Sequence, residues 1–174
     1  TLFHATLPAQ YVQIPDAKLN EALLEHGVDT NEDFFISFEE AEAVDSLSLF
    51  NQISDMTGIE AFTNLRYLDL FNESIETPLN LITHLDVSQN TSLEFLDCSY
   101  NQLDTLILGI QDYLLELNCF ANIQLSHLDL SGCPNLKTVV CGNIPLEELD
   151  IRNCRQLEQL YLDEIFDPFV TYVW

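Results

Sequence analysis

Basic side chains are scarce in this chain of 174 residues, which carries 5 Lys and Arg against 29 Asp and Glu. The formal net charge is −24 at pH 7. Binding to nucleic acid depends on cations that displace the counterions of the phosphates, and anionic membranes attract the same cations. The composition therefore argues against a nucleic-acid partner. Acidic residues are spread along the chain, so most of them are expected to form a solvated surface.

Long apolar runs and common catalytic motifs are also absent from the sequence. No run reaches the roughly 20 apolar residues of a membrane helix, so we expect no transmembrane segment. The opening residues TLFHATLPAQ lack the charged start and apolar centre of a signal peptide. The patterns G-x-S-x-G, H-E-x-x-H, C-x-x-C and the P-loop do not occur. We therefore expect that the chain is not an enzyme.

Only four histidines are present, and one of them offers an alternative to the non-enzymatic interpretation. His127 and Glu148 share a column of the repeats described below, at a spacing that predicts neighbours. Such a pair is a fragment of an acid–base or metal site. We interpret both residues as members of a polar surface, and an enzyme is the third hypothesis for function.

A repeat dominates the second part of the sequence, where segments of the form L-x-x-L-x-L recur. One series begins at residues 65, 93, 114, 136 and 157, and a second begins at residues 82, 103, 125 and 146. Within each series the segments are 21 or 22 residues apart, except for a first interval of 28, which predicts an insertion at residues 76–82. Each segment has too little apolar surface to fold alone, so the repeats are expected to stack into a solenoid.

The positions within each repeat have distinct expected roles. The leucines at positions 1, 4 and 6 are expected to form a continuous core ladder. Asn101 and Asn122 follow eight residues after the first leucine of their segments, where an amide can bind backbone groups at a tight corner. Asn72 and Asn143 come one residue earlier, so we expect their corners to differ.

The five cysteines follow the same repeat. Three share position 6 of the first series and two share a corner of the second: Cys98, Cys119 and Cys141, then Cys133 and Cys154. Successive turns lie about 4.8 Å apart, a spacing that permits disulfides. The odd count, and leucine at the same position of other segments, favour buried free thiols instead.

Two helices are predicted before the repeats. Residues 14–27 combine a Pro-Asp start, apolar residues at helical spacing and a final glycine. The segment SFEEAEAVDSLSL begins a second helix, with Ser37 as N-cap and Glu40 three residues later as a capping box. An open end of a solenoid exposes leucines to water, so these helices are expected to cap the stack.

The loop between these helices matches in part the spacing of a calcium-binding EF-hand. Position 6 of such a loop favours a glycine with positive φ, and here it is Phe34, which strains the loop. Two interpretations stay open: a structural calcium ion, or a metal-free link whose aromatic residues Phe34, Phe35 and Phe38 pack the cap onto the repeats. The candidate calcium ligands are the side chains of Asp29, Asn31, Asp33, Ser37 and Glu40 and the carbonyl of Phe35.

These segments resemble leucine-rich-repeat proteins of the bacterial type with 21–22 residues per repeat. TSLEFLDCSYNQLDTL and SHLDLSGCPNLKTV are similar to repeats of Bacteroidetes surface proteins, and the resemblance covers roughly residues 11–165. Caps of that family carry glycines where DTNEDFFIS has Glu32 and Phe34, and the helix–loop–helix layout resembles the caps of internalins. The resemblance implies a right-handed superhelix with parallel strands, and a protein located outside the cell or on its surface.

The resemblance also implies a binding face, because side chains at positions 3, 5 and 7 of each strand project from the sheet in this family. Aromatic and acidic residues mix at these positions, which suits recognition of a protein or a sugar. The alternative is that the insertion or the tail FDPFVTYVW covers some of these aromatics. The predicted ligand-binding face comprises Tyr67, Asp69, Phe71, Phe95, Asp97, Glu116, Asn118, Phe120 and Tyr161.

The sequence thus predicts an α/β solenoid in one continuous structural unit. A helical cap occupies residues 1–60, with an EF-hand-like loop at 29–40, and leucine-rich repeats with an apolar tail occupy residues 61–174. The predicted function is a non-enzymatic protein-interaction module of a secreted or cell-surface bacterial protein, present as a monomer. A carbohydrate-binding surface protein is the alternative. The expected partner is a protein or a glycan, and no cofactor is required apart from the calcium ion left open above.

Overall fold

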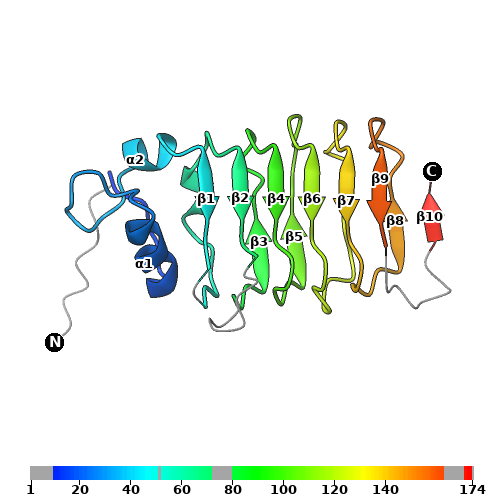
Figure 1. Cartoon of the computed structure of the whole chain (residues 1–174), viewed down its shortest axis with the longest axis horizontal. Coiled ribbons are helices and arrows are strands. Elements are labelled where there is room, and N and C mark those ends of the chain that lie inside the picture. Colours follow the sequence, from blue (N-terminus) through cyan, green and yellow to red (C-terminus); the bar gives the residue numbers. More distant parts are fainter. Residues whose placement is uncertain (1–9, 51, 72–79, 163–170, 174) are drawn as a thin grey trace.

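The computed structural model describes residues 10–50, 52–71, 80–162 and 171–173. The chain forms an elongated stack of turns with a helical segment at its N-terminal end (Figure 1). A six-stranded parallel sheet runs along one side, and its strands follow one another in chain order. They are β1 Ser46–Ser48, β2 Tyr67–Asp69, β4 Phe95–Asp97, β6 Glu116–Asn118, β7 Thr138–Val140 and β9 Gln159–Tyr161.

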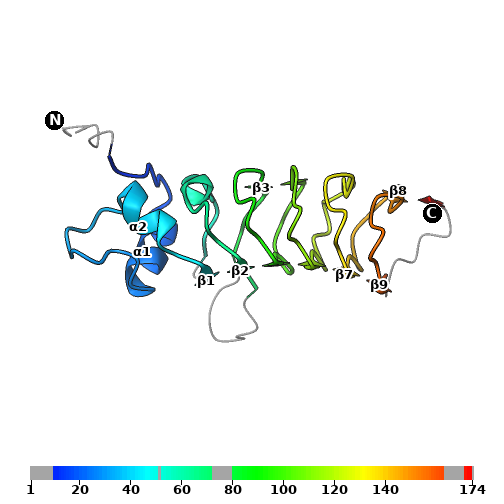
Figure 2. The ribbon, with the colours of Figure 1, turned by 90° about the horizontal axis from the view of Figure 1, so that it is seen from above.

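A second, interrupted ladder lies on the opposite side of the stack (Figure 2). It contains two parallel pairs, β3 His84–Asp86 with β5 Thr105–Ile107 and β8 Glu148–Asp150 with β10 Thr171–Val173. A single bridge joins Asp129 to Asp150. The strands from β2 to β9 each begin two residues after a segment of the repeat begins. The predicted solenoid of parallel strands is therefore confirmed, whereas its right-handed sense stays a prediction.

Burial alternates along the strands from β1 to β8 and builds one continuous core. The central residue is buried and its neighbours are exposed or half-buried, as around Leu68, Leu96 and Leu117. Each leucine buried in this way stabilises the fold by about 1.5–3 kcal/mol relative to an exposed one. The leucines of the last described turn are only half-buried: Leu157, Leu160 and Leu162. The core ladder predicted from the sequence is confirmed.

Two corner asparagines bind backbone groups as the sequence predicts. The buried amide Nδ2 of Asn122 donates to the carbonyls of Cys98 and Cys119 at 3.1 and 2.9 Å. Its Oδ1 accepts a hydrogen bond from the N–H of Leu103 at 3.0 Å. Asn101 likewise donates to the carbonyl of Cys98 in its own turn at 3.1 Å and to that of Leu70 in the preceding turn at 3.4 Å. Each amide thus joins the corner of its own turn to a neighbouring turn of the stack.

Three further amides bind backbone groups at corners of the stack and are not predicted from the sequence. Asn80 takes the corner of the first repeat, where its Nδ2 donates to the carbonyls of Leu49 and Leu70 at 2.9 and 3.1 Å. Asn90 and Gln111 bind carbonyls at the equivalent corners of the second ladder. Because of the insertion, Asn80 lies fifteen residues after Leu65, the first leucine of its segment. A search for asparagine at the usual distance of eight residues therefore misses it.

Other predictions about corners and the tail have separate outcomes. Asn143 is exposed and has a φ of 54°, so its corner differs from the buried amides as expected. Asn72 and residues 76–79 of the predicted insertion lie outside the described residues. Of the predicted tail, residues 163–170 and 174 also lie outside them, and β10 pairs with β8 in the second ladder.

All five cysteines are free and buried, as the sequence predicts. Cys98, Cys119 and Cys141 each follow a strand of the six-stranded sheet. Burial raises the pKa of Cys133 and Cys141 to about 12. Buried thiols with so high a pKa stay protonated at neutral pH and act as small apolar side chains.

One hydrogen bond recurs at the ends of β2, β3, β4, β6 and β8 and at the Asp129 bridge. The Oδ1 atom at position 5 of the repeat accepts the N–H of the residue two positions later, at 2.8–3.1 Å. This Asx turn bends the chain out of the sheet. Asn118 makes the bond as well as aspartate does, so the turn needs no charge. The residues are Asp69, Asp86, Asp97, Asn118, Asp129 and Asp150.

Short helices form the N-terminal segment, and none of the described helices is long and apolar enough to cross a membrane. Asp16 caps the first helix, and its other carboxylate oxygen accepts from the N–H of Ser54 at 2.9 Å. This bond fastens the helix to the first turn of the stack. Ser37 and Glu40 form the predicted capping box of the second helix. The elements are α1 Ala17–Glu25, α2 Phe38–Glu42 and the 3₁₀ turn η1 Ile59–Ala61.

The second helix is shorter than the sequence predicts. SFEEAEAVDSLSL begins as a helix but leaves it after Glu42, and its Ser46–Ser48 part forms β1, parallel to β2. The Ser-Leu-Ser alternation suits a strand, because it places Leu47 in the core between two exposed serines. The six-stranded sheet therefore begins within the residues assigned to the cap.

Replacing Asn122 by alanine is expected to lower the free energy of unfolding by about 2–4 kcal/mol, because two carbonyls and one N–H lose their partner in the core. Urea unfolding of the variant and the wild type measures this difference. The control is Asn153→Ala, which removes an exposed amide that donates to the carbonyl of Ser131 at 3.3 Å and should change stability by less than about 0.5 kcal/mol. Equal losses in both variants would contradict a special role of the corner amides.

Candidate functional site

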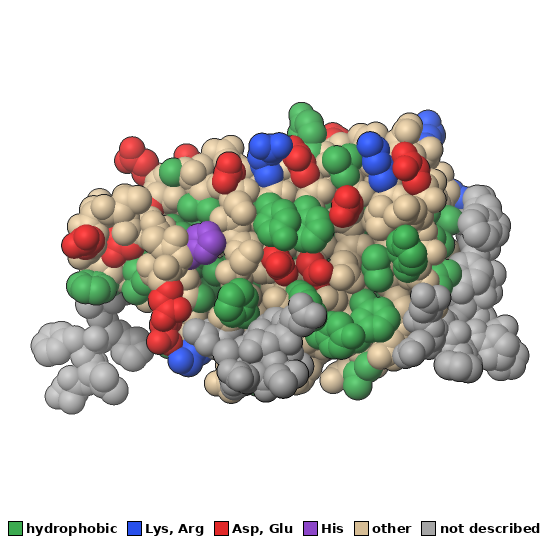
Figure 3. Space-filling view, in the orientation of Figure 1, with side chains coloured by type: hydrophobic (Ala, Val, Ile, Leu, Met, Phe, Trp, Pro, Cys, Tyr) green, Lys and Arg blue, Asp and Glu red, His purple; other side chains and the backbone are tan. Residues whose placement is uncertain are grey.

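Aromatic side chains stack at the start of two neighbouring strands. The register places Tyr67 of β2 beside Phe95 of β4, with ring centroids 4.5 Å apart and ring planes only 6° from parallel. Figure 3 shows hydrophobic and acidic side chains gathered over the middle of this face of the sheet. The stacked pair forms a flat platform that is open to solvent.

A second aromatic row lies beyond the ends of the same strands. The ring centroid of Tyr100 lies 5.4 Å from that of Phe71 and 5.4 Å from that of Phe120. Tyr100 is exposed and has a left-handed backbone conformation, with φ of 54°. Sequence reasoning assigns the two phenylalanines to the face and misses Tyr100, which stands at position 8, after the strand. An aromatic residue directly before the corner Asn101 is the signal that could have found it.

Two carboxylates and one amide lie between the aromatic rows. Asp69 and Asp97 are partners in the register of β2 and β4, and Asn118 donates from Nδ2 to Oδ2 of Asp97 at 2.7 Å. Burial raises the pKa of Asp69, and the negative charge of Asp97 adds to this effect. Burial and these two carboxylates also raise the pKa of Tyr67. The acids and the aromatic platform therefore act on one another.

Together these side chains make one surface, which we name the aromatic–acidic face. It spans β2, β4 and β6 and the corners that follow them. Because equivalent residues of parallel strands lie side by side, the aromatic and acidic positions form rows across the sheet. The face consists of Tyr67, Asp69, Phe71, Phe95, Asp97, Tyr100, Asn118 and Phe120.

Two residues of the predicted face lie at its margin or apart from it. Glu116 is exposed and is the register partner of Phe95, so it extends the first row onto β6. Tyr161 of β9 is exposed, and its register partner is Val140 of β7. Because β7 separates β9 from β6, the structure does not bring Tyr161 together with the aromatic–acidic face.

His127 and Glu148 line one hollow on the side of the second ladder. The hollow has a volume of about 530 Å³ and is also lined by Asp129 and Asp150. Nδ1 of His127 lies 2.9 Å from the hydroxyl of Ser126. The structure thus confirms that the two residues are near each other. Their surroundings are other polar side chains of an open surface.

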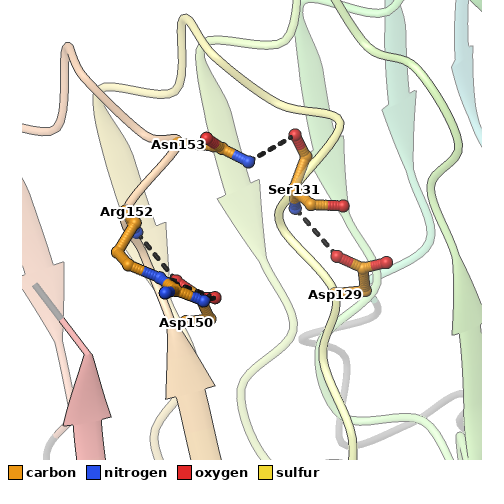
Figure 4. A network of polar contacts seen from close by, with 5 residues as sticks. All are labelled: Asp129, Ser131, Asp150, Arg152 and Asn153. Carbon is orange, nitrogen blue, oxygen red and sulfur yellow. Dashed lines mark hydrogen bonds and ion pairs between the residues drawn. The ribbon is translucent and has the colours of Figure 1, made fainter.

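The second ladder also holds an acidic pair, and an arginine of the chain binds one member of it. Figure 4 shows Arg152 folded over Asp150, with Nε of the arginine 2.9 and 3.0 Å from the two carboxylate oxygens. Hydrogen bonds from Arg152 lower the pKa of Asp150 to about 2. Asp129, on the neighbouring turn, accepts the N–H of Ser131. An arginine of the chain therefore balances the charge at this place.

The loop at 29–40 is held by hydrogen bonds among its own groups. Oδ2 of Asp29 accepts from the N–H of Phe34 at 2.8 Å. Oε1 of Glu40 accepts from the N–H and hydroxyl of Thr30 at 2.8 and 2.9 Å. Oε2 accepts from the N–H and hydroxyl of Ser37 at 2.9 and 2.8 Å. Both oxygens of this carboxylate are thus engaged by the protein.

Four candidate calcium ligands accept hydrogen bonds from backbone N–H groups of the loop itself: Asp29, Asn31, Asp33 and Glu40. Within the described ranges, no group of three or more His, Cys, Asp or Glu residues is placed to hold a metal ion. Glu32 and Phe34 have φ of 62° and 68°, so the loop keeps positive φ at the two positions where similar caps carry glycine. Calcium binding by the set predicted from the sequence stays a prediction: Asp29, Asn31, Asp33, Phe35, Ser37 and Glu40.

The aromatic residues of the loop do not pack the cap onto the repeats, contrary to the metal-free interpretation. Phe34 is 72% exposed, and Phe35 and Phe38 are 44% and 45% exposed. Ile36 takes the buried position between them, and its carbonyl accepts from the N–H of Val12 at 2.8 Å. Because neighbouring side chains of an extended segment point to opposite sides, burial of Ile36 turns Phe35 outward.

Comparison of the sequence with known families gives one match. The family described as Leucine Rich Repeat matches residues 92–112, which include β4 and the start of the next turn. No curated protein matches the chain. The match covers one repeat, and the architecture of the chain extends the same pattern on either side of it. These findings support a leucine-rich-repeat protein.

Solved structures of the same fold include two internalins of Listeria monocytogenes strain 4b F2365. Internalin C2 is 18% identical, with a TM-score of 0.57, and the match covers 95% of this chain and 99% of that one. The internalin InlF is 23% identical, with a TM-score of 0.50, over 90% of this chain and 59% of that one. The LRIM1/APL1C complex gives 17% identity and a TM-score of 0.52, over 92% of this chain and 37% of that one. This chain therefore spans little more than half of InlF. At these identities the likeness concerns the fold.

Replacing Glu40 by glutamine is expected to destabilise the protein by about 1–2 kcal/mol at pH 7. Burial alone would raise the pKa of Glu40, but hydrogen bonds from Ser37 and Thr30 outweigh it and hold the pKa at about 2, below the usual 4.5. The stabilisation by ionised Glu40 is therefore complete above about pH 4.5 and disappears as pH falls through about 2. Urea unfolding across this range should show the gap between variant and wild type closing with acid.

The control for this series is Glu39→Gln, which changes an exposed carboxylate in the same first turn of α2. Its free energy of unfolding should follow that of the wild type at every pH in the range. A gap at Glu40→Gln that does not depend on pH would contradict the assigned role of the carboxylate.

Calcium at about 1 mM is expected to leave the melting temperature unchanged relative to excess chelator, because Glu40 is engaged by Thr30 and Ser37. An ion that bound only the folded state would raise the melting temperature by mass action. Differential scanning calorimetry measures the shift. A rise that Asp29→Asn abolishes would show that the loop rearranges around calcium as the sequence-based alternative predicts.

Proposed function

We propose that this chain is a non-enzymatic module that binds a protein through the aromatic–acidic face. The observation that carries the proposal is the pairing of two aromatic rows around Asp69 and Asp97 on one exposed sheet surface. Aromatic side chains give large contact area at low cost in conformational entropy, and they are enriched among the residues that dominate protein interfaces. The rigid sheet holds them in place before a partner arrives, which reduces the entropic cost of binding.

The fold supports this function. Leucine-rich repeats are typical of protein-interaction modules, and one solved structure with this fold is the LRIM1/APL1C complex. No catalytic family is indicated by the comparisons. We further propose a secreted or cell-surface protein of bacterial origin, of the Bacteroidetes type, that acts as a monomer. The internalin-like fold and the resemblance of the repeats support this location.

A carbohydrate partner is the second candidate function. The observation that favours it is the flat platform of Tyr67 and Phe95, whose rings are 6° from parallel. Such a surface can stack against the apolar face of a sugar ring, and the neighbouring carboxylates can accept hydrogen bonds from its hydroxyl groups. A glycan array probed with the labelled protein distinguishes the two candidates: hits that free sugar displaces favour the carbohydrate.

Replacing both Phe95 and Phe120 by alanine is expected to reduce capture of the partner at least about tenfold, because the change removes one ring from each aromatic row. The measurement is capture of surface proteins on immobilised wild type and variant, quantified by mass spectrometry. The control is Ile110→Ala with Tyr113→Ala, which removes exposed apolar side chains outside the aromatic–acidic face. Melting curves check that each variant folds. Undiminished capture by Phe95→Ala/Phe120→Ala would contradict the proposed face.

A further inference from the structure

The aromatic–acidic face carries a carboxylate pair that no cation of the described chain neutralises. We propose that this face docks a segment of a partner protein that presents an arginine, whose guanidinium lies over Asp69 and Asp97 between the two aromatic rows. The inference rests on the proposed function and adds to it the chemistry of the partner.

The second ladder shows how this chain supplies a cation to one acid of an equivalent pair. Asp129 and Asp150 stand at the same position of the repeat as the acids of the face, and a parallel bridge joins them. Position 7 supplies Arg152 there, and its guanidinium lies against the carboxylate of Asp150 (Figure 4). On β2 and β4 position 7 is Phe71 and Ser99, which bring no charge. On the face, an arginine in the equivalent position would therefore have to come from another molecule.

The arginine that directly precedes β2 is engaged elsewhere. Arg66 precedes β2, and its Nε and Nη2 atoms donate to the two carboxylate oxygens of Glu94 at 2.8 and 2.9 Å. Ion pairs among the described residues join Lys18 to Glu21, Arg66 to Glu94 and Arg152 to Asp150. None of these pairs involves a carboxylate of the aromatic–acidic face.

Asp69 of the face and Asp150 of the second ladder also differ in the direction of their pKa shift. Burial, with repulsion from Asp97, raises the pKa of Asp69, whereas hydrogen bonds from Arg152 lower that of Asp150. Asp69 therefore lacks the arginine partner that Asp150 has, and the side chains that donate to Asp97 are neutral: Asn118 and Ser99. A cation supplied from outside would relieve the repulsion between Asp69 and Asp97.

The aromatic rows favour a guanidinium over other cations. Alternate residues of a strand lie about 7 Å apart, so the rows stand on either side of the carboxylates within reach of one side chain. A guanidinium binds carboxylates through paired N–H groups and also stacks on aromatic rings, whereas an ammonium is a more strongly hydrated point charge. The platform of Tyr67 and Phe95 and the ring of Tyr100 supply the aromatic surfaces.

The size and charge of the face favour a protein segment over a free cation. The second aromatic row runs from Phe71 through Tyr100 to Phe120, which is more surface than one cation covers. Residues beside the arginine can bury apolar side chains against this row. The net charge of −24 attracts basic partners and raises their rate of encounter.

The test compares two double variants with equal charge. Asp69→Asn/Asp97→Asn removes the carboxylates of the face, and its matched control is Asp86→Asn/Asp129→Asn on the second ladder. All four aspartates accept the same Asx-turn hydrogen bond, which Asn118 shows an asparagine can make. Each double variant changes the net charge from −24 to −22. Melting curves confirm that both fold.

The probe is a short fluorescein-labelled peptide of alternating Arg and Ser, with a peptide of alternating Gln and Ser as its neutral counterpart. Fluorescence anisotropy in about 150 mM salt gives the dissociation constants, since salt at this level screens attraction at long range. We expect Asp69→Asn/Asp97→Asn to weaken binding of the Arg peptide about tenfold or more, and the control to stay within about twofold of the wild type.

Three results would overturn the inference. Equal weakening in both double variants would assign binding to the overall charge, and equal binding of the neutral peptide would remove the role of arginine. Displacement of the peptide by free arginine amide at a concentration near the dissociation constant of the peptide would assign the face to a small cation.

A second experiment distinguishes failure of this inference from failure of the proposed function. It repeats the capture of surface proteins described for the proposed function with the two double variants Phe95→Ala/Phe120→Ala and Asp69→Asn/Asp97→Asn. Capture that Phe95→Ala/Phe120→Ala abolishes and Asp69→Asn/Asp97→Asn leaves unchanged would refute the arginine and keep the interaction face. Capture that neither variant reduces would refute the face itself.

Discussion

The backbone hydrogen bonds between parallel strands hold equivalent residues of successive turns about 4.8 Å apart. Every other feature of the molecule depends on this spacing. It brings leucine against leucine in the core and lets the corner amides reach carbonyls of the neighbouring turn. It also places the ring centroids of Tyr67 and Phe95 4.5 Å apart. The same spacing places Asp69 beside Asp97, although their like charges repel. Favourable and unfavourable contacts on the surface therefore have one origin.

Much of the architecture follows from the sequence, because residues that recur every 21–22 positions pack against the equivalent residues of the next turn. The leucine core and the corner at Asn122 are predicted for this reason, whereas the capping box of Ser37 and Glu40 is predicted from a local pattern at the start of a helix. β1 is not, since it lies before the repeats and follows residues with strong helix signals. Ser-Leu-Ser becomes a strand because it pairs with the edge of β2 and because Leu47 packs into the core. This pairing is a tertiary contact, so the local sequence of the segment does not reveal it.

The candidate site is predictable only in part, for related reasons. Positions 3, 5 and 7 are assigned to the face by counting along the strand, which finds Tyr67, Phe95 and Phe120. Tyr100 reaches the same surface from a corner with positive φ, a backbone conformation that counting does not reveal. Tyr161 has the correct position but stands beyond β7, where valine and threonine interrupt the aromatic rows. Which turns are neighbours matters as much as the position within each turn.

Alternation of buried and exposed residues along the strands from β1 to β8 separates the core from the surface. Leu68 and Leu96 point inward, while the residues on either side of them point toward solvent. Substitutions at the exposed positions therefore leave the packing of the core intact, and Asn118 shows that even the turn at the strand end tolerates the loss of a charge. Changes at the exposed positions can thus alter the surface of the sheet one side chain at a time while the protein stays folded. A solenoid of this kind is evolvable at its surface because its fold is determined at positions that the surface does not expose.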